Sequence, residues 1–172
     1  MKTIKYITAA LALAATGSTF AADVTLNFTG TLILPTCSVS TGTANQTIPL
    51  GTARTTDFAA VGSTQNPAAF EIDLQNCQSG TNVAMTVSGT QVGANVGVLV
   101  STGSAVGVGV QLLTTATVGA TTGTPLALNS AISRGVVSGT SMTIPLAAQM
   151  YRTGTMSAGD VAAIATVNFT YN

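Results

Sequence analysis

Hydrophobic and polar residues alternate strictly at both ends of the chain. Near the start, one parity carries Val24, Leu26, Phe28, Gly30 and Leu32, and the other carries Thr25, Asn27, Thr29 and Thr31. At the C-terminus, one parity carries Val161, Ala163, Ala165, Val167, Phe169 and Tyr171. A period of two is typical of a β-strand with one buried and one exposed face. The pattern predicts strands over residues 24–34 and 161–171.

Between these ends, short runs rich in valine, threonine, isoleucine and leucine are separated by glycine, serine, asparagine and proline. Helical periodicity is absent after the first 21 residues, so the pattern predicts an all-β fold such as a β-sandwich. The further strands that we predict cover residues 37–40, 46–50, 69–75, 82–88, 97–101, 106–114, 125–128 and 142–150. No linker or change of composition divides the region, which indicates one domain.

The first residues have the features of a secretion signal. Met1, Lys2 and Lys5 precede an apolar run over residues 7–15, and small residues lead to Ala21. We therefore predict a signal peptide over residues 1–21, cleaved after Ala21, and an exported protein. The apolar run is too short to span a bilayer, so direct membrane insertion is not expected. The remaining chain divides into an extension, residues 22–35, and a domain, residues 36–172.

Charged residues make up only 6% of the chain, far below the usual quarter. Both lysines fall in the signal peptide, which leaves three arginines against five acidic residues, a net charge of −2. Because there is no basic patch, nucleic acid and a polybasic membrane site are poor candidates for partners. A surface this poor in charge suits a protein covered by copies of itself. A surface solvated by hydroxyl groups is the alternative explanation.

Two cysteines, Cys37 and Cys77, remain in the exported chain. In an oxidising compartment this even number predicts a disulfide. Closing a loop of this length stabilises a protein by about 4 kcal/mol on the loop-entropy model. A reactive or metal-binding thiol pair is less well supported, because the chain has no histidine and no CxxC spacing.

The sequence offers little for catalysis. Without histidine there is no Ser-His or Cys-His nucleophile pair. Glu71 and Asp73 share one strand face, as two carboxylates of a glycosidase could. However, Phe70, Ile72 and Leu74 take the opposite face, so the two acids are expected to face solvent. We predict no catalytic residue, no metal and no cofactor.

Several motifs together resemble the pilins of chaperone–usher fimbriae, of the type 1 and P pilus kind. At the N-terminus these are the sequence from Ala22 to Thr25, the gap at Gly30 and the run from Pro35 to Val39. Residues 70–77 are similar to the segment with the family's second cysteine. At the C-terminus, Gly159 is fourteenth from the end and Tyr171 is penultimate. With the alternating residues between them, they resemble the motif that the periplasmic chaperone reads in this family.

The resemblance implies an incomplete immunoglobulin-like β-sandwich that lacks its last strand. A donor strand from a neighbouring subunit would complete it by β-strand addition. The donor residues would be Val24, Leu26, Phe28, Gly30 and Leu32. The C-terminal chaperone and polymerisation motif would be Gly159, Val161, Ala163, Ala165, Val167, Phe169 and Tyr171. The expected partners are a periplasmic chaperone, an outer-membrane usher and other pilin subunits.

The implied function is that of a structural subunit of a cell-surface fimbria that contributes to cell adhesion. The sequence does not decide between a shaft subunit and a minor tip adaptor. Two alternatives remain. The terminal strands could be the first and last strands of a closed sandwich in a monomer. The chain could also be a secreted carbohydrate-binding module, although it has no tryptophan and few aromatic residues for a sugar-stacking surface.

Overall fold

The structure is a computed structural model that describes residues 26–32, 36–94 and 97–172. The chain divides into two compact units, Met1–Leu32 and Ile33–Asn172. In the first unit, residues 26–32 have no regular secondary structure. The predicted signal peptide and Val24 lie outside the described residues, so both stay predictions.

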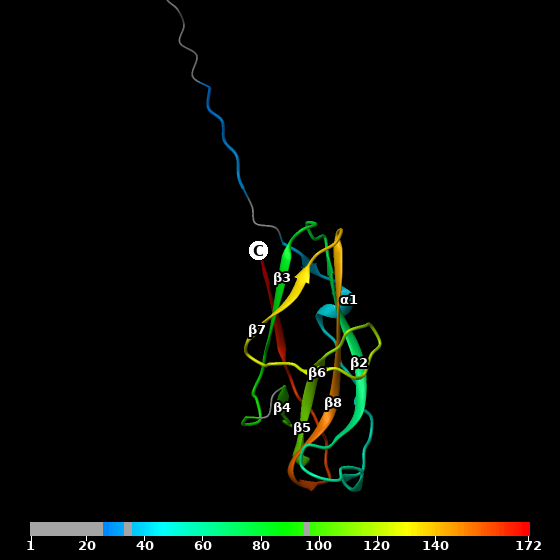
Figure 1. The fold of residues 1–172 in the computed structure, drawn as a ribbon. Coiled ribbons are helices and arrows are strands. Elements are labelled where there is room, and N and C mark those ends of the chain that lie inside the picture. Colours follow the sequence, from blue (N-terminus) through cyan, green and yellow to red (C-terminus); the bar gives the residue numbers. More distant parts are fainter. Residues whose placement is uncertain (1–25, 33–35, 95–96) are drawn as a thin grey trace, which may run out of the picture. The chain divides into compact units, whose positions relative to one another are not determined.

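The second unit contains two antiparallel sheets (Figure 1). The strands of the first sheet, in spatial order, are β1 (Ser38–Val39), β2 (Thr64–Gln75), β8 (Ser141–Ser157), β5 (Val106–Thr114) and β4 (Val98–Val100), with β6 (Thr124–Pro125) paired to β5. The order in the second sheet is β7 (Ala131–Val136), β3 (Asn82–Ser88) and β9 (Thr166–Tyr171). Two short helical segments, α1 (Thr41–Ala44) and a 3-10 helix (Thr55–Asp57), precede β2.

Alternate residues of both sheets meet in the main core. Ile72 and Leu74 of β2 are buried against Val83, Met85 and Val87 of β3. The core also takes in Leu99, Val110, Leu112, Ile144, Leu146 and Ala148 from the first sheet. This inward set follows the period of two in each strand. The all-β prediction is therefore confirmed, and the two sheets form a sandwich.

Most of the predicted strands are present, and two match residue for residue. β3 covers residues 82–88 and β5 covers residues 106–114, as the alternation predicted. β8 is longer than predicted and continues to Ser157. Among the described residues, no helix is long and apolar enough to cross a membrane.

Three strand predictions need correction. Residues 46–50 form no strand, because it is the side chain of Gln46 that bonds to β2: its Nε2 donates to the carbonyl of Glu71 at 2.7 Å. The last strand begins only at Thr166, since residues 160–162 bond to a loop and not to β3. Residues 26–32 form no strand in the first unit.

The sequence did not predict β7, because a bulge at Arg134 and Gly135 interrupts its alternation.

Candidate functional site

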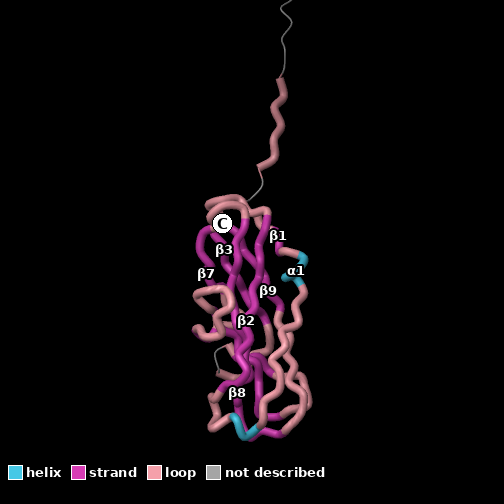
Figure 2. The backbone as a smooth tube through the Cα atoms, turned by 90° about the vertical axis from the view of Figure 1, so that its right-hand side faces the viewer, coloured by secondary structure: helices cyan, strands magenta, loops and turns pink. Residues whose placement is uncertain are grey.

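The C-terminal strand lies at the margin of the second sheet. β9 pairs with β3 in continuous antiparallel register, from Ser88 opposite Thr166 to Val83 opposite Tyr171. No other described strand pairs with β9. Figure 2 shows the strands of both sheets running lengthwise along the domain. We call the side of residues 160–171 that points away from β3 the open edge.

The backbone groups at this open edge follow from the register. Asn82 and Asn172 exchange two hydrogen bonds, of 2.7 and 3.0 Å, so they form a hydrogen-bonded pair. In an antiparallel ladder such pairs alternate with pairs that do not exchange hydrogen bonds. Val167, Phe169 and Tyr171 therefore direct their N–H and C=O groups away from β3. No described residue bonds to these six groups, so they are available to another strand.

The side chains of the same three residues point toward the core. Val167, Phe169 and Tyr171 are half-buried and pack against the core cluster. Residues from the other end of the domain pack against the same cluster and are also half-buried: Cys37, Val39, Ile48 and Leu50. Desolvation raises the pKa of the Tyr171 hydroxyl above its ordinary value. The core is thus partly exposed along β9, which is where a missing strand would cover it.

Residues 160–162, which precede β9, form backbone hydrogen bonds with a loop of the first sheet and not with β3. The carbonyls of Asp160 and Ala162 accept hydrogen bonds from the backbone N–H groups of Ala105 and Thr102, at 3.0 and 2.7 Å. Val161 and Ala163 still pack against the core. Ala165 is exposed, which corrects the burial that its parity predicted, because it precedes the start of β9. Ile164, on the other parity, is 82% exposed.

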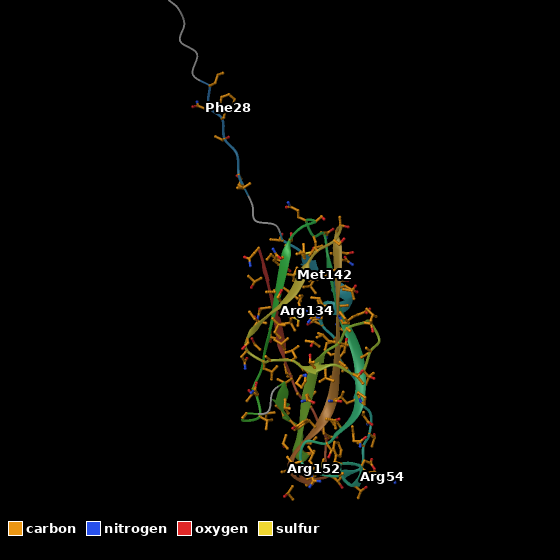
Figure 3. The ribbon with its side chains drawn as sticks, in the orientation of Figure 1. Phe28, Arg54, Arg134, Met142 and Arg152 are labelled. Atoms are coloured by element: carbon orange, nitrogen blue, oxygen red, sulfur yellow. A yellow bond between two sulfur atoms is a disulfide. The ribbon has the colours of Figure 1, made fainter. Side chains whose placement is uncertain are left out.

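A cleft of about 400 Å³ lies at the Val161 end of the open edge. Its lining combines Val161 and Gly159 with a small second core cluster of Phe58, Val108 and Met150. Arg152 is bonded to this cluster, because its Nη1 donates to the carbonyl of Phe58 at 2.9 Å. Figure 3 places Arg152 and Arg54 at the same end of the sandwich, away from Met142 and Arg134. The cleft can take an apolar side chain.

The apolar residues of the predicted donor segment are exposed. Leu26 is 69% exposed, Phe28 is 89% exposed and Leu32 is fully exposed. A Cβ at Gly30 would meet nothing within 4 Å. Figure 3 labels Phe28 on this segment. Exposing three large apolar side chains on one short segment is unfavourable in water, so the segment is typical of one that is covered by a partner.

The predicted disulfide is present. Cys37 and Cys77 are bonded, with their Cα atoms 4.3 Å apart. Cys77 follows β2 and donates its backbone N–H to the carbonyl of Thr140, which precedes β8. The disulfide therefore fixes the start of the domain, immediately after the extension, to the end of the first sheet.

One of the two acids on β2, Asp73, has a structural contact through its carboxylate. Asp73 accepts a hydrogen bond from the hydroxyl of Thr143 at 2.6 Å, and both Glu71 and Asp73 are half-exposed. Within the part of the chain that the structure describes, no group of three histidine, cysteine or acidic residues could hold a metal ion. The open edge is thus the feature of the domain that is best suited to a function.

Comparison with known proteins identifies the family. The family model for fimbrial proteins matches residues 26–172. The chain belongs to the fimbrial protein family. The type-1 fimbrial protein A chain of Escherichia coli K12 is 33% identical over 180 residues, which cover 96% of this chain and 94% of that protein. The type 1 fimbrial subunit of Klebsiella pneumoniae is 32% identical over 156 residues, which cover 86% and 82% of the two chains.

Solved structures confirm the pilin fold. The crystal structure of the P pilus rod subunit PapA matches with a TM-score of 0.65 at 19% identity, covering 79% of this chain and 99% of PapA. A subunit in the structure of a chaperone–usher pilus matches with a TM-score of 0.68 at 19% identity, covering 87% and 96%. A type I fimbria protein of Burkholderia pseudomallei matches with a TM-score of 0.55 at 30% identity, covering 79% and 88%.

This fimbrial protein is a structural pilus subunit, and its family is exported to the fimbriae of the cell surface. The resemblance read from the sequence is therefore confirmed, and so is the fold class. The sequence also pointed to the two terminal segments. It did not reveal the contact of residues 160–162 with residues 101–105, because a loop of serine, threonine, glycine and alanine carries no pattern that distinguishes it from others.

Proposed function

We propose that this fimbrial subunit polymerises by donor-strand exchange along the open edge. The extension of one subunit, residues 22–35, would add to β9 of the next as an antiparallel strand, the orientation of every strand pair in the domain. The observation that supports this best is that two properties occur in the same three residues of β9. Val167, Phe169 and Tyr171 have both half-buried apolar side chains and unpaired backbone groups on the open edge.

The donor segment is complementary to this edge. Its backbone would supply partners for the unpaired groups, and Val24, Leu26, Phe28 and Leu32 would cover the exposed part of the core. Burying four such side chains stabilises an assembly by a gross amount on the order of 10 kcal/mol. A shift by one residue would insert threonine and asparagine instead, so the register is well defined. Gly30 would occupy a position with no room for a side chain.

The same edge also serves the proposed route of assembly. Before polymerisation, a periplasmic chaperone would cover it with a strand of its own, since an unpaired apolar edge leads to aggregation. Gly159, Val161, Ala163, Ala165, Val167, Phe169 and Tyr171 would form the segment that the chaperone contacts. An outer-membrane usher would then pass the subunit into the fibre. In this role the chain carries out no catalysis, and the fibre contributes to cell adhesion.

A rearranged protein tests the proposal. One protein is the exported chain, residues 22–172; the other lacks residues 22–34 at its start and carries them after Asn172 through a short flexible linker. We expect the rearranged protein to be a stable monomer, and the natural chain to unfold at a lower temperature or to oligomerise. A third protein is the control for the linker. It keeps the linker, but the apolar and polar residues of the moved segment exchange positions.

Thermal unfolding and sedimentation measure both properties. If the natural chain is already a stable monomer and the rearrangement adds nothing, then the terminal strands complete their own fold and the proposal is wrong. The secreted carbohydrate-binding module would then need to be tested, by binding of the monomer to a glycan array.

A further inference from the structure

A loop of the first sheet holds the beginning of the open edge in place. The loop covers residues 101–105, between β4 and β5, and we call it the serine loop. Its backbone N–H groups at Thr102 and Ala105 donate to the carbonyls of Ala162 and Asp160, at 2.7 and 3.0 Å. Residues 160–162 are thereby bonded to the first sheet, whereas β9 is bonded to β3 in the second sheet.

Two serine hydroxyls complete this contact. Ser104 Oγ accepts the backbone N–H of Asp160 at 2.9 Å, and Ser101 Oγ accepts the backbone N–H of Ala162 at 3.3 Å. Side-chain oxygens thus accept hydrogen bonds from backbone N–H groups that would bond to the carbonyls of a neighbouring strand in a ladder. Each serine satisfies an N–H that has no strand beside it, and leaving such a group without a partner costs free energy.

The approach of the two segments is close enough to need glycine. A Cβ at Gly159 would lie 2.5 Å from the backbone nitrogen of Ala105 and 2.7 Å from the carbonyl carbon of Ser104. A Cβ at Gly103 would collide with the carbonyl of Asp160. This gives a packing reason for Gly159, for which the family resemblance implies a role in chaperone recognition.

The contact determines how far the open edge extends. Asp160 and Ala162 direct their backbone groups toward the serine loop, so Val161 between them directs its own to the other side. Val161 also packs against the core and lines the cleft at this end. The open edge therefore continues past the start of β9 only because the serine loop orients these residues.

We infer that Ser101 and Ser104 are positioning residues for the donor strand, because they extend the docking edge from β9 to Val161. This inference rests on the proposed function. In antiparallel addition, the backbone N–H groups of Gly30 and Leu32 in the donor lie against residues 161–165. Those of Val24 and Leu26 lie against β9. The two halves of the donor should therefore respond differently when the serine loop is altered.

Hydrogen exchange in assembled fibres of the full exported chain tests the inference. In the double variant Ser101→Ala, Ser104→Ala, we expect the amides of Gly30 and Leu32 to exchange about five-fold faster or more, the effect of losing about one net hydrogen bond. The amides of Val24 and Leu26, and those of β3 and β5, should keep their rates. A general loss of stability would instead raise exchange in β3 and β5 as well.

Matched variants control for the substitution itself. Ser130 and Ser138 are exposed and make no side-chain hydrogen bond to the described residues, so Ser130→Ala, Ser138→Ala should leave all rates unchanged. Ser101→Thr, Ser104→Thr retains both hydroxyls and should restore slow exchange at Gly30 and Leu32. If the double alanine variant does not assemble, the two single variants are measured by the same criteria.

The outcomes separate the two proposals. If the donor amides are protected in natural fibres and their rates are equal in the serine variants, the serine loop has no positioning role and the inference is overturned, while donor-strand exchange stands. If the donor amides are unprotected in natural fibres, donor-strand exchange is wrong and the inference falls with it. Faster exchange confined to Gly30 and Leu32 supports both.

Discussion

The aromatic rings of Phe169 and Tyr171 lie side by side on β9, with their centres 6.5 Å apart and their planes inclined by 19°. They are two residues apart in one strand, so both project from its inward face. Both are half-buried and pack against the core. Together they form an apolar surface at the end of β9, beside the open edge that the donor strand would cover.

Removing one of these rings should weaken the domain and the fibre together. We expect Phe169→Ala to lower the free energy of unfolding by about 2 kcal/mol, less than the 3–5 kcal/mol of a fully buried phenylalanine. Tyr171→Phe keeps the ring and should change it by less than about 0.5 kcal/mol. Urea unfolding of the protein with the rearranged donor strand measures both. Equal losses for the two variants would contradict a role for the ring.

A change in the donor segment should affect assembly without affecting the subunit. Phe28 is 89% exposed in the single chain, so Phe28→Ser should leave the unfolding of the subunit unchanged. In a fibre it would remove a buried side chain, which costs roughly 3 kcal/mol, or about a hundred-fold in the stability of the contact between subunits. Dissociation of fibres in guanidinium chloride measures this effect.

Thr29→Ser is the matched control for Phe28→Ser, because it lies on the other parity of the same segment. It should leave fibre dissociation near that of the natural protein. Equal effects of the two substitutions would show that the parity of the segment does not determine its insertion.

The titration of Tyr171 should report on the open edge. Its pKa is raised by desolvation above the ordinary value of 10.0, so the folded state holds the proton more tightly than the unfolded chain does. Above pH 10 the unfolded state therefore binds fewer protons, and the free energy of unfolding falls as pH rises through the folded pKa. A donor strand would bury the hydroxyl further. Ultraviolet absorbance of tyrosinate should show a higher pKa in fibres than in subunits, and Tyr171→Phe should abolish the difference.

Loss of the disulfide should destabilise the subunit strongly. The bond between Cys37 and Cys77 closes a loop with a separation of 40 residues. Replacing both cysteines with serine should lower the free energy of unfolding by about 4 kcal/mol on the loop-entropy model. Chemical unfolding of the rearranged protein, with and without reductant, provides the measurement. A reductant should have no effect on the double serine variant.

Arg134 is expected to lower the free energy of unfolding. It occupies the bulge of β7, and its Nε has no hydrogen-bond partner among the described residues. Desolvation also lowers the pKa of its guanidinium. Arg134→Met should raise the free energy of unfolding by up to about 1 kcal/mol, since solvent reaches part of the side chain and screens the remaining cost.

The same substitution should make the outer edge of the second sheet more prone to aggregation. β7 is the outer strand of the second sheet beside β3, and a bulge with a charged residue protects such an edge from pairing with other chains. Arg134→Met should therefore increase aggregation, measured by light scattering during refolding. Arg134→Lys keeps the charge and should not. Unchanged aggregation in the methionine variant would show that the bulge alone protects this edge.

The sequence by itself determined the elements whose alternation is complete. β3 has an unbroken period of two and β5 alternates from Val106 to Leu112, and each was predicted with its exact bounds because side chains on the core face of a strand must be apolar. Alternation also pointed to the two terminal segments, whereas the disulfide followed from the even number of cysteines and the family from its motifs. Strand periodicity and sequence motifs depend on neighbouring residues, so one sequence is enough to recognise them, and two cysteines in an exported chain allow one intramolecular pairing.

The tertiary structure alone decided how the chain is divided between the two sheets. Residues 160–162 have the same alternation as β9, yet they bond to residues 101–105, because β3 ends at Ser88 and offers them no partner. Ile48 and Leu50 alternate like a strand, but a side chain of Gln46 occupies the edge of β2. Hydrogen bonds between strands depend on which segments become neighbours in space, and periodicity within one segment does not contain that information.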